Sequence, residues 1–217
     1  MKTFAHRYTR WACLTVAGCL AWMTVPAATA EAANIVSIEE LWELSIGKPT
    51  PDRSSPQTSM LMSPHEDLKS TYFMFTLNHK SFPNFSAGGM QVQEWDGDNV
   101  WHIQNGPQTG TMGHENETVN WSQILEIHDG LLTFEVLNGS SQSWNSFGGQ
   151  GYLKLSTSTG LRNLNGYRLY NTLGESEVGY AGNRVQTLVL KKLIWVTDDN
   201  EVHELLAPIA IDTELDP

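Results

Sequence analysis

The densest group of acidic residues in the chain is Glu94-Trp95-Asp96-Gly97-Asp98-Asn99. Side chains alternate between the faces of a strand, so Glu94 and Asp96 would share one face. Two carboxyl groups arranged in this way are the acid and the base or nucleophile of most glycoside hydrolases. Asp96 and Asp98 would also offer oxygen ligands to calcium, although the complete calcium-loop pattern is absent. The third interpretation is a type I′ turn made by Asp-Gly and Asn, with solvated acids beside it.

A second stretch, residues 138–170, combines aromatic rings with amides, hydroxyls and glycines. The candidate ligand-binding residues in it are Trp144, Asn145, Gln150, Tyr167 and Tyr170. Such a set suits a sugar, whose CH groups stack on a ring while amides bond the hydroxyls. The alternative is that Trp144 closes one end of a hydrophobic core. We expect Trp144 to belong to the core and Tyr170 to be exposed.

Other reaction chemistries lack a local signature. The histidines after residue 30 show neither an HxH nor an HExxH spacing, so no zinc site is indicated. A Gly-x-Ser-x-Gly nucleophile turn is also missing. The sequence therefore identifies no reaction. The histidines concerned are His65, His79, His102, His114, His128 and His203.

The elements that must position these residues read as strands from Ser70 onward. Apolar and aromatic runs alternate with Gly, Asn and Asp turns, and Asp96–Asn99 and Asp129-Gly130 are strong hairpin signals. Lys191-Lys192 interrupts both faces of a long run, which predicts a bulge or an edge. No convincing helix follows residue 46. The expected strands are 72–77, 90–95, 100–104, 121–128, 131–137, 152–156, 185–197 and 201–206.

This pattern predicts an all-β antiparallel domain. Several strands are apolar on both faces, which favours a two-sheet sandwich of jelly-roll or lectin-like type. Residues 34–46 fit either a helix or a strand, and residues 48–64 read as a proline-punctuated loop. We therefore divide the chain into a leader of residues 1–30, an N-terminal segment of residues 31–69 that includes this loop, and a sandwich domain of residues 70–217.

Residues 1–30 have the pattern of a signal peptide. Three basic residues precede an apolar run from Trp11 to Val25, and Ala28-Thr29-Ala30 offers small residues before Glu31. The run falls short of the roughly twenty residues that span a bilayer. Lipoprotein processing at Cys19, after Val16-Ala17-Gly18, is the alternative. We expect export to the periplasm, cell surface or medium, with a mature start at Glu31.

Charge narrows the classes of partner. Both cysteines lie within the first 20 residues, so the mature chain would have neither a thiol nor a disulfide. Loss of the three basic leader residues takes the formal net charge from −11 to −14. Such acidity argues against nucleic acid and anionic lipid as partners. Cation binding, a neutral ligand and simple solubility all remain compatible with it.

Four stretches of the sequence stand out together: Trp42-Glu43-Leu44, the run from Trp144 to Gly151, the run from Leu164 to Tyr167, and the run from Gly179 to Val185. These stretches resemble a group of exported proteins of planctomycete-type bacteria. The resemblance implies secretion and a shared fold. It carries over no catalytic residue, because the group has no established activity.

Three functional hypotheses follow. The first is a secreted, non-enzymatic binding module with polysaccharide as the first candidate ligand. The second is a glycan hydrolase or lyase on the same fold, using Glu94 and Asp96. The third is a calcium-binding structural or interaction protein of the cell envelope.

Overall fold

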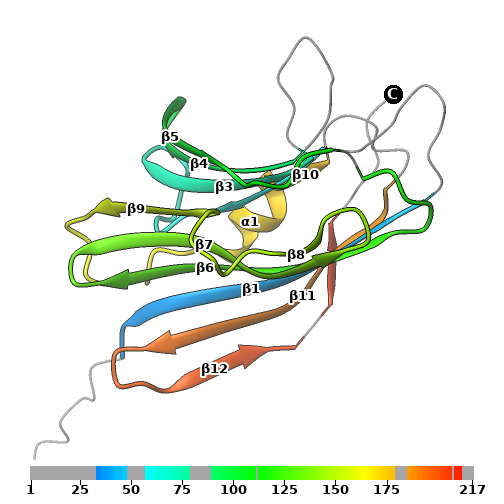
Figure 1. Ribbon diagram of the computed structural model, residues 1–217. Coiled ribbons are helices and arrows are strands. Elements are labelled where there is room, and N and C mark those ends of the chain that lie inside the picture. Colours follow the sequence, from blue (N-terminus) through cyan, green and yellow to red (C-terminus); the bar gives the residue numbers. More distant parts are fainter. Residues whose placement is uncertain are drawn as a thin grey trace, which may run out of the picture. The chain divides into compact units, whose positions relative to one another are not determined.

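The structure is a computed structural model that describes residues 33–47, 57–78, 89–110, 112–178, 185–206 and 208–211. The predicted leader, His79 and most of the Gly179–Val185 stretch lie outside these ranges. The described residues form two antiparallel sheets and one short helix, α1 (Leu169–Glu175) (Figure 1). The prediction of an all-β, two-sheet sandwich is confirmed.

The larger sheet has the order β12-β11-β1-β6-β7-β8, with β13 paired to β11 and β9 paired to β7. The smaller sheet has the order β10-β2-β3-β4-β5. The strands of the larger sheet are β1 (Ile35–Ile46), β6 (Thr118–His128), β7 (Leu131–Ser141), β8 (Asn145–Phe147), β9 (Lys154–Ser158), β11 (Val185–Thr197), β12 (Val202–Leu205) and β13 (Ile209–Ile211). Those of the smaller sheet are β2 (Thr58–Met62), β3 (Thr71–Leu77), β4 (Met90–Asp96), β5 (Asn99–Asn105) and β10 (Glu177–Val178).

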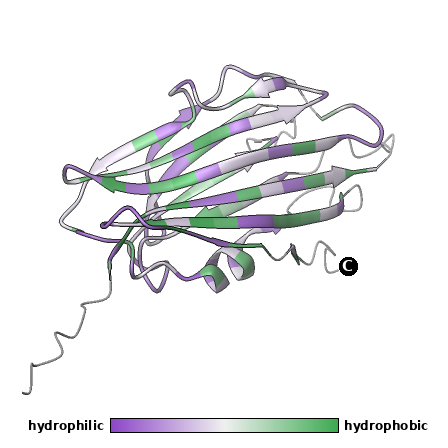
Figure 2. Cartoon of the chain, turned by 90° about the horizontal axis from the view of Figure 1, so that it is seen from below, coloured by the Kyte–Doolittle hydropathy of each residue, from purple (hydrophilic) through white to green (hydrophobic). Residues whose placement is uncertain are grey.

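The hydrophobic core lies between the sheets. Hydrophobic and hydrophilic residues alternate along many strands, as the period of a strand requires (Figure 2). In β1 every second residue from Ile38 to Ile46 is buried. The sheets meet at Phe73 of β3 and Phe134 of β7, whose rings stack 5.4 Å apart. This contact defines the inner face of each sheet, and the residues that alternate with Phe73 therefore lie on the outer face.

The structure resolves or corrects four features of the sequence interpretation. The ambiguous segment is strand β1, paired on both sides within the larger sheet. The proline-punctuated loop contains strand β2, which is buried along its whole length. Its run Met60-Leu61-Met62 is too short to show a period, and the neighbouring Ser, Thr and Pro suggested a loop. The sandwich therefore also takes strands from before residue 70, and a helix does form after residue 46.

Turns and bulges follow the predicted positions, with one change of type. Asp129 and Gly130 both have positive φ, which fits a type I′ hairpin. In the β4–β5 hairpin only Gly97 has positive φ, the pattern of a type II′ turn rather than the expected I′. The β1–β11 ladder skips Lys191 between Lys192 and Leu190, so the bulge predicted there is confirmed.

Gly139 allows the closest approach within the larger sheet. It pairs with Phe147, and a Cβ on Gly139 would lie 2.1 Å from Cε2 of that buried ring. We predict that Gly139→Ala destabilises the fold by about 1–3 kcal/mol, the usual range for overpacking. Denaturant unfolding measures the change. Gly160→Ala is the matched control because a Cβ there meets nothing within 4 Å; equal stabilities of the two variants would contradict this account.

Candidate functional site

The outer face of the smaller sheet carries a continuous row of side-chain hydrogen bonds. Gln91 Nε2 donates to Asn105 Oδ1 at 2.7 Å, Gln93 donates to Gln91, and Trp95 Nε1 donates to Gln93 Oε1 at 2.9 Å. The row begins on β5 and follows β4, because Gln91, Gln93 and Trp95 alternate with inner-face residues. We call Asn105, Gln91, Gln93, Trp95 and Tyr72 the amide–aromatic row.

Tyr72 extends the row onto β3. It pairs with Trp95 across the ladder, and the two rings stack with centroids 5.9 Å apart and planes inclined by 7°. The pKa of the Tyr72 hydroxyl is raised by burial and then by the negative charges of Asp98 and Glu175. The phenol is therefore a neutral hydrogen-bond donor at neutral pH, beside a negative local field.

Four of the five residues of the row are accessible from solvent, whereas Gln91 is buried. Tyr72, Gln93 and Trp95 are half-buried, and Asn105 is exposed. Half-burial suits binding, because packing holds the side chains in place while leaving part of each in contact with water. In principle the alternation of Gln91, Gln93 and Trp95 was visible in the sequence. The predicted site used the acidic residues of the adjoining hairpin and did not include these amides.

The acidic hairpin does not present two free carboxylates. Glu94 points inward and is buried, and its Oε2 lies 2.7 Å from Nδ1 of His102 on β5. Asp96 is exposed at the end of β4, beside the turn that holds Asp98. A glycosidase needs both carboxyl groups open to the substrate. Glu94 is instead the fixed partner of a largely exposed imidazole.

The side chains around this hairpin do not supply further ligands for the predicted calcium site. Within the described residues, no group of three or more His, Cys, Asp or Glu side chains lies close enough to hold a metal ion. Asp96 and Asp98 occupy opposite flanks of Gly97 in the tight turn. The turn interpretation accounts for both residues.

The five residues of the predicted aromatic site are not brought together. Trp144 lies near the Ile46 end of β1, where the Glu117 carboxylate accepts hydrogen bonds from Ser143 and the Glu117 carbonyl accepts one from Ile46. Tyr167 lies near the other end, where Leu164 N donates to the carbonyl of Ile35. The 12 residues of β1 separate these ends. No single ligand of modest size reaches both Trp144 and Tyr167.

Their individual environments differ as well. Trp144 is 6% exposed and packs edge-on against Phe147 at 6.5 Å, so the core interpretation is confirmed for it. Asn145, the first residue of β8, is exposed with φ of 56°, and Gln150 is exposed in the following glycine-rich turn. Tyr170, on α1, is 67% exposed, as expected.

Tyr167 belongs to a buried polar cluster around Glu40. This carboxylate is completely buried on the inner face of β1. Its Oε1 accepts from Tyr167 Oη at 2.7 Å and from Thr172 Oγ1 at 3.0 Å. Its Oε2 accepts from Trp42 Nε1 at 3.0 Å and from Gln123 Nε2 at 2.8 Å. Sequence reasoning missed Glu40, because residues 34–46 fitted either a helix or a strand and no face was assigned to it.

Burial raises the pKa of Glu40, and the four hydrogen bonds oppose that rise only in part. None of these four partners is a cation. Burial also raises the pKa of Tyr167 well above its usual range, with further contributions from the charge and the hydrogen bond of Glu40. The cluster is therefore a carboxyl group held by neutral donors inside the protein. Inaccessible to ligands, it is a structural centre rather than a binding site.

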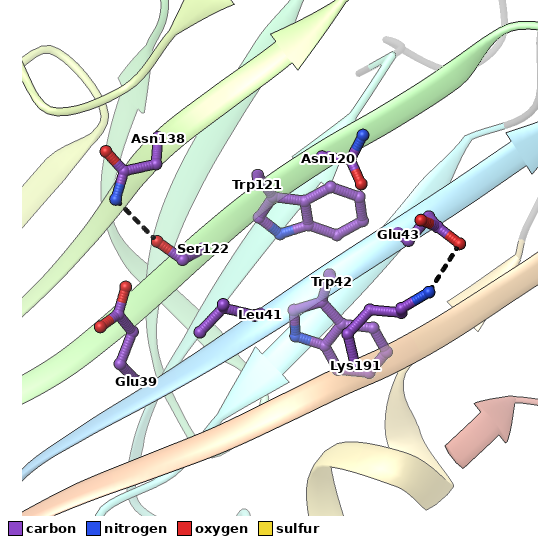
Figure 3. A pocket seen from close by; sticks show the side chains of 9 residues that line it. All are labelled: Glu39, Leu41, Trp42, Glu43, Asn120, Trp121, Ser122, Asn138 and Lys191. Carbon is purple, nitrogen blue, oxygen red and sulfur yellow. Dashed lines mark hydrogen bonds and ion pairs between the residues drawn. The ribbon is translucent and has the colours of Figure 1, made fainter. Parts of the chain in front are cut away.

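The outer face of the larger sheet has a hollow of ≈ 280 Å³ (Figure 3). The ion pair of Lys191 with Glu43, at 3.1 Å, and the hydrogen bond from Asn138 to Ser122, at 3.5 Å, lie on opposite sides of it. Both Lys191 and Asn138 sit where a ladder is bulged. The nine lining residues are Glu39, Leu41, Trp42, Glu43, Asn120, Trp121, Ser122, Asn138 and Lys191.

This hollow is lined by residue types that suit a sugar, but its two aromatic rings are buried and offer no face to a ligand. Trp42 and Trp121 stack on each other with centroids 6.2 Å apart, and both are almost completely buried. A sugar needs an exposed ring face to stack on. The amide–aromatic row, with half-buried rings and an exposed amide at its end, is therefore the better candidate surface.

Comparisons with known proteins do not assign this chain to a family. No protein-family model matches this chain, and a search of curated proteins finds no match. Within the described residues, no helix has the length and apolar character needed to cross a bilayer.

The two aromatic residues of the predicted site should respond differently to truncation. We predict that Trp144→Ala costs about 3–5 kcal/mol of unfolding free energy, because it removes a buried indole. Tyr170→Ala should stay within about 0.5 kcal/mol, as for most exposed positions. Denaturant unfolding of both variants checks this. A Tyr170→Ala loss as large as that of Trp144→Ala would contradict the assigned environments.

The Glu40 cluster predicts a pH-dependent stability. A pKa raised by folding means that the native state binds the proton more tightly than the unfolded state. The resulting stabilisation is complete below the ordinary glutamate pKa of 4.5 and is lost as pH rises through the raised pKa of the folded state. Glu40→Gln removes this titration. Its amide oxygen would accept from Trp42 and Gln123, and its NH₂ would donate to the two hydroxyls.

We therefore expect the wild type to lose stability relative to Glu40→Gln as pH rises above about 4.5, by at most about 1.4 kcal/mol per pH unit. Urea unfolding between pH 4 and pH 8 measures the difference. Glu39→Gln, on the opposite face of β1, controls for the loss of one charge. A wild type–Glu40→Gln difference that is independent of pH would exclude a raised pKa.

Proposed function

We propose that this chain is an exported, non-enzymatic glycan-binding β-sandwich whose binding surface is the amide–aromatic row. The observation that supports the proposal is the chain of side-chain hydrogen bonds that links Asn105, Gln91, Gln93 and Trp95. It ends at the stacked rings of Trp95 and Tyr72. Sugar hydroxyls exchange hydrogen bonds with amides of this kind, and sugar CH groups pack on aromatic rings.

The pre-formed row explains how an uncharged, hydroxyl-rich ligand would be recognised. Each amide already satisfies a neighbour, so its orientation is fixed before binding and little rotamer entropy is lost. The row also extends along β4, from Asn105 on β5 at one end to Tyr72 on β3 at the other, which suits an extended polymer better than a small molecule in a pocket.

Charge indicates the class of glycan. Asp98 and Glu175 lie close enough to Tyr72 to raise its pKa, and the whole chain has a formal net charge of −11. A polysaccharide rich in carboxylate or sulfate groups would be repelled from this surface. We therefore propose an uncharged polysaccharide as the ligand. Export, predicted from the first 30 residues, would bring the protein to such polymers.

Binding is tested by retention on a panel of insoluble neutral polysaccharides, with an acidic polysaccharide for comparison and with and without calcium. We predict that Trp95→Ala and Asn105→Ala each weaken retention by roughly tenfold, the effect of losing about 1.4 kcal/mol. Tyr170→Ala is the matched control, because its ring is exposed outside the row. Melting temperatures confirm that each variant is folded.

Two results would contradict the proposal. One is a wild-type protein that binds no neutral polysaccharide of the panel. The other is loss of binding in Tyr170→Ala with full binding in Trp95→Ala and Asn105→Ala, which would return the site to the region of α1.

A further inference from the structure

Strand β5 is poorly covered for a strand of a folded sheet. Six of its seven residues are exposed, whereas β4 beside it is mostly buried. Even His102, which faces inward with Glu94, has more than half of its side chain in solvent. Trp101 is 61% exposed and Ile103 is 54% exposed. Strand β5 is therefore covered only in part by the larger sheet, which reaches it at β9, near the hydrogen bond from Gln104 Nε2 to the carbonyl of Gly151.

Strand β5 also has a free edge. It pairs with β4, and no other described strand pairs with it. The other described strands with one pairing partner are β8, β9, β10, β12 and β13, and they have two to five residues against seven for β5. An edge of this length presents a row of unpaired backbone N–H and C=O groups to other chains.

The usual protections of an edge are weak on β5. Its sequence, from Asn99 to Asn105, contains neither proline nor a charged residue. By contrast, β9 carries Lys154, β10 carries Glu177 and β12 carries Glu204. The one irregularity is a bulge at Trp101, where the β4 ladder steps from Val100 to His102. It lies near one end and leaves residues 102–105 regular.

The neutrality of β5 identifies the partner that fits it. The chain has a formal net charge of −11, so two copies repel each other over most of their surfaces. Strand β5 carries no Lys, Arg, Asp or Glu, so two copies brought together there would not oppose charges of these side chains. Two antiparallel copies of one strand are self-complementary, as a twofold interface requires.

We propose that the protein forms a twofold homodimer by antiparallel pairing of β5 with β5 of a second copy, which continues the smaller sheet across the interface. With the axis at Ile103, the regular residues 102–104 of the two copies would pair, so that Ile103 lies opposite Ile103 and Trp101 of each copy lies diagonally across from Ile103 of the other. Aromatic and β-branched residues are favourable cross-strand neighbours. The outer faces of the two smaller sheets would then adjoin.

Sedimentation velocity of the exported chain over a range of micromolar concentrations tests the proposal without any glycan, so its outcome is independent of the proposed function. The wild type should sediment as a dimer, and Ile103→Lys should raise the dissociation constant by roughly tenfold or more. The matched control is Val202→Lys, at a 68% exposed position on the edge strand β12, which should remain dimeric. Circular dichroism confirms that each variant is folded.

A wild type that stays monomeric throughout would overturn the dimer. So would an Ile103→Lys variant that dimerises as tightly as the wild type, or a Val202→Lys variant that dissociates instead. Open-ended assemblies larger than a dimer would exclude the closed twofold pairing.

Discussion

Much of this structure depends on how one buried carboxyl group is satisfied. Glu40 lies on the inner face of the larger sheet, yet its hydrogen-bond donors come from three parts of the chain. Trp42 and Gln123 belong to the sheet itself, whereas Tyr167 and Thr172 belong to the segment that contains α1. A buried carboxyl without such donors would be costly, so the fold is constrained to bring this segment onto β1.

The same segment then connects the two sheets. Helix α1 has seven residues and no side-chain N-cap, so its own hydrogen bonds contribute little stability. It contacts β2, and beyond its end Ser176 Oγ accepts a hydrogen bond from Leu61 N. Residues 177–178 continue as β10 beside β2. The chain thus passes from the Glu40 cluster to the smaller sheet within a few residues.

Because the interior is filled, the chemistry available to a ligand lies on outer faces. The stacked indoles of the larger sheet are buried beneath its outer hollow, and Glu94 turns inward to His102. On the smaller sheet, alternation places Phe73, Phe75 and Val92 in the core, and the residues between them supply Tyr72 and the amides. The candidate surface is the other face of the strands that build the core.

This division explains what could be predicted from the sequence. The hairpins were predictable because Asp-Gly and its neighbours specify turns locally. The bulge at Lys191 was predictable because this residue interrupts an apolar run. Strand β2 and the burial of Glu40 were not, because each depends on what packs against it from distant segments. The predicted aromatic site was wrong as a set for the same reason. Trp144 and Tyr167 are close in sequence and were assigned to one surface, but they lie near opposite ends of β1.

The central claim is that the amide–aromatic row, and not the buried or helical aromatic residues, contacts glycan. Fluorine NMR of protein labelled with 5-fluorotryptophan, titrated with neutral soluble polysaccharides, tests it most directly. Substitution of single tryptophans by Phe assigns the resonances. The account predicts that the Trp95 resonance shifts or broadens on binding while those of Trp42, Trp121 and Trp144 stay fixed. A shift of the Trp144 resonance with Trp95 unchanged would contradict it.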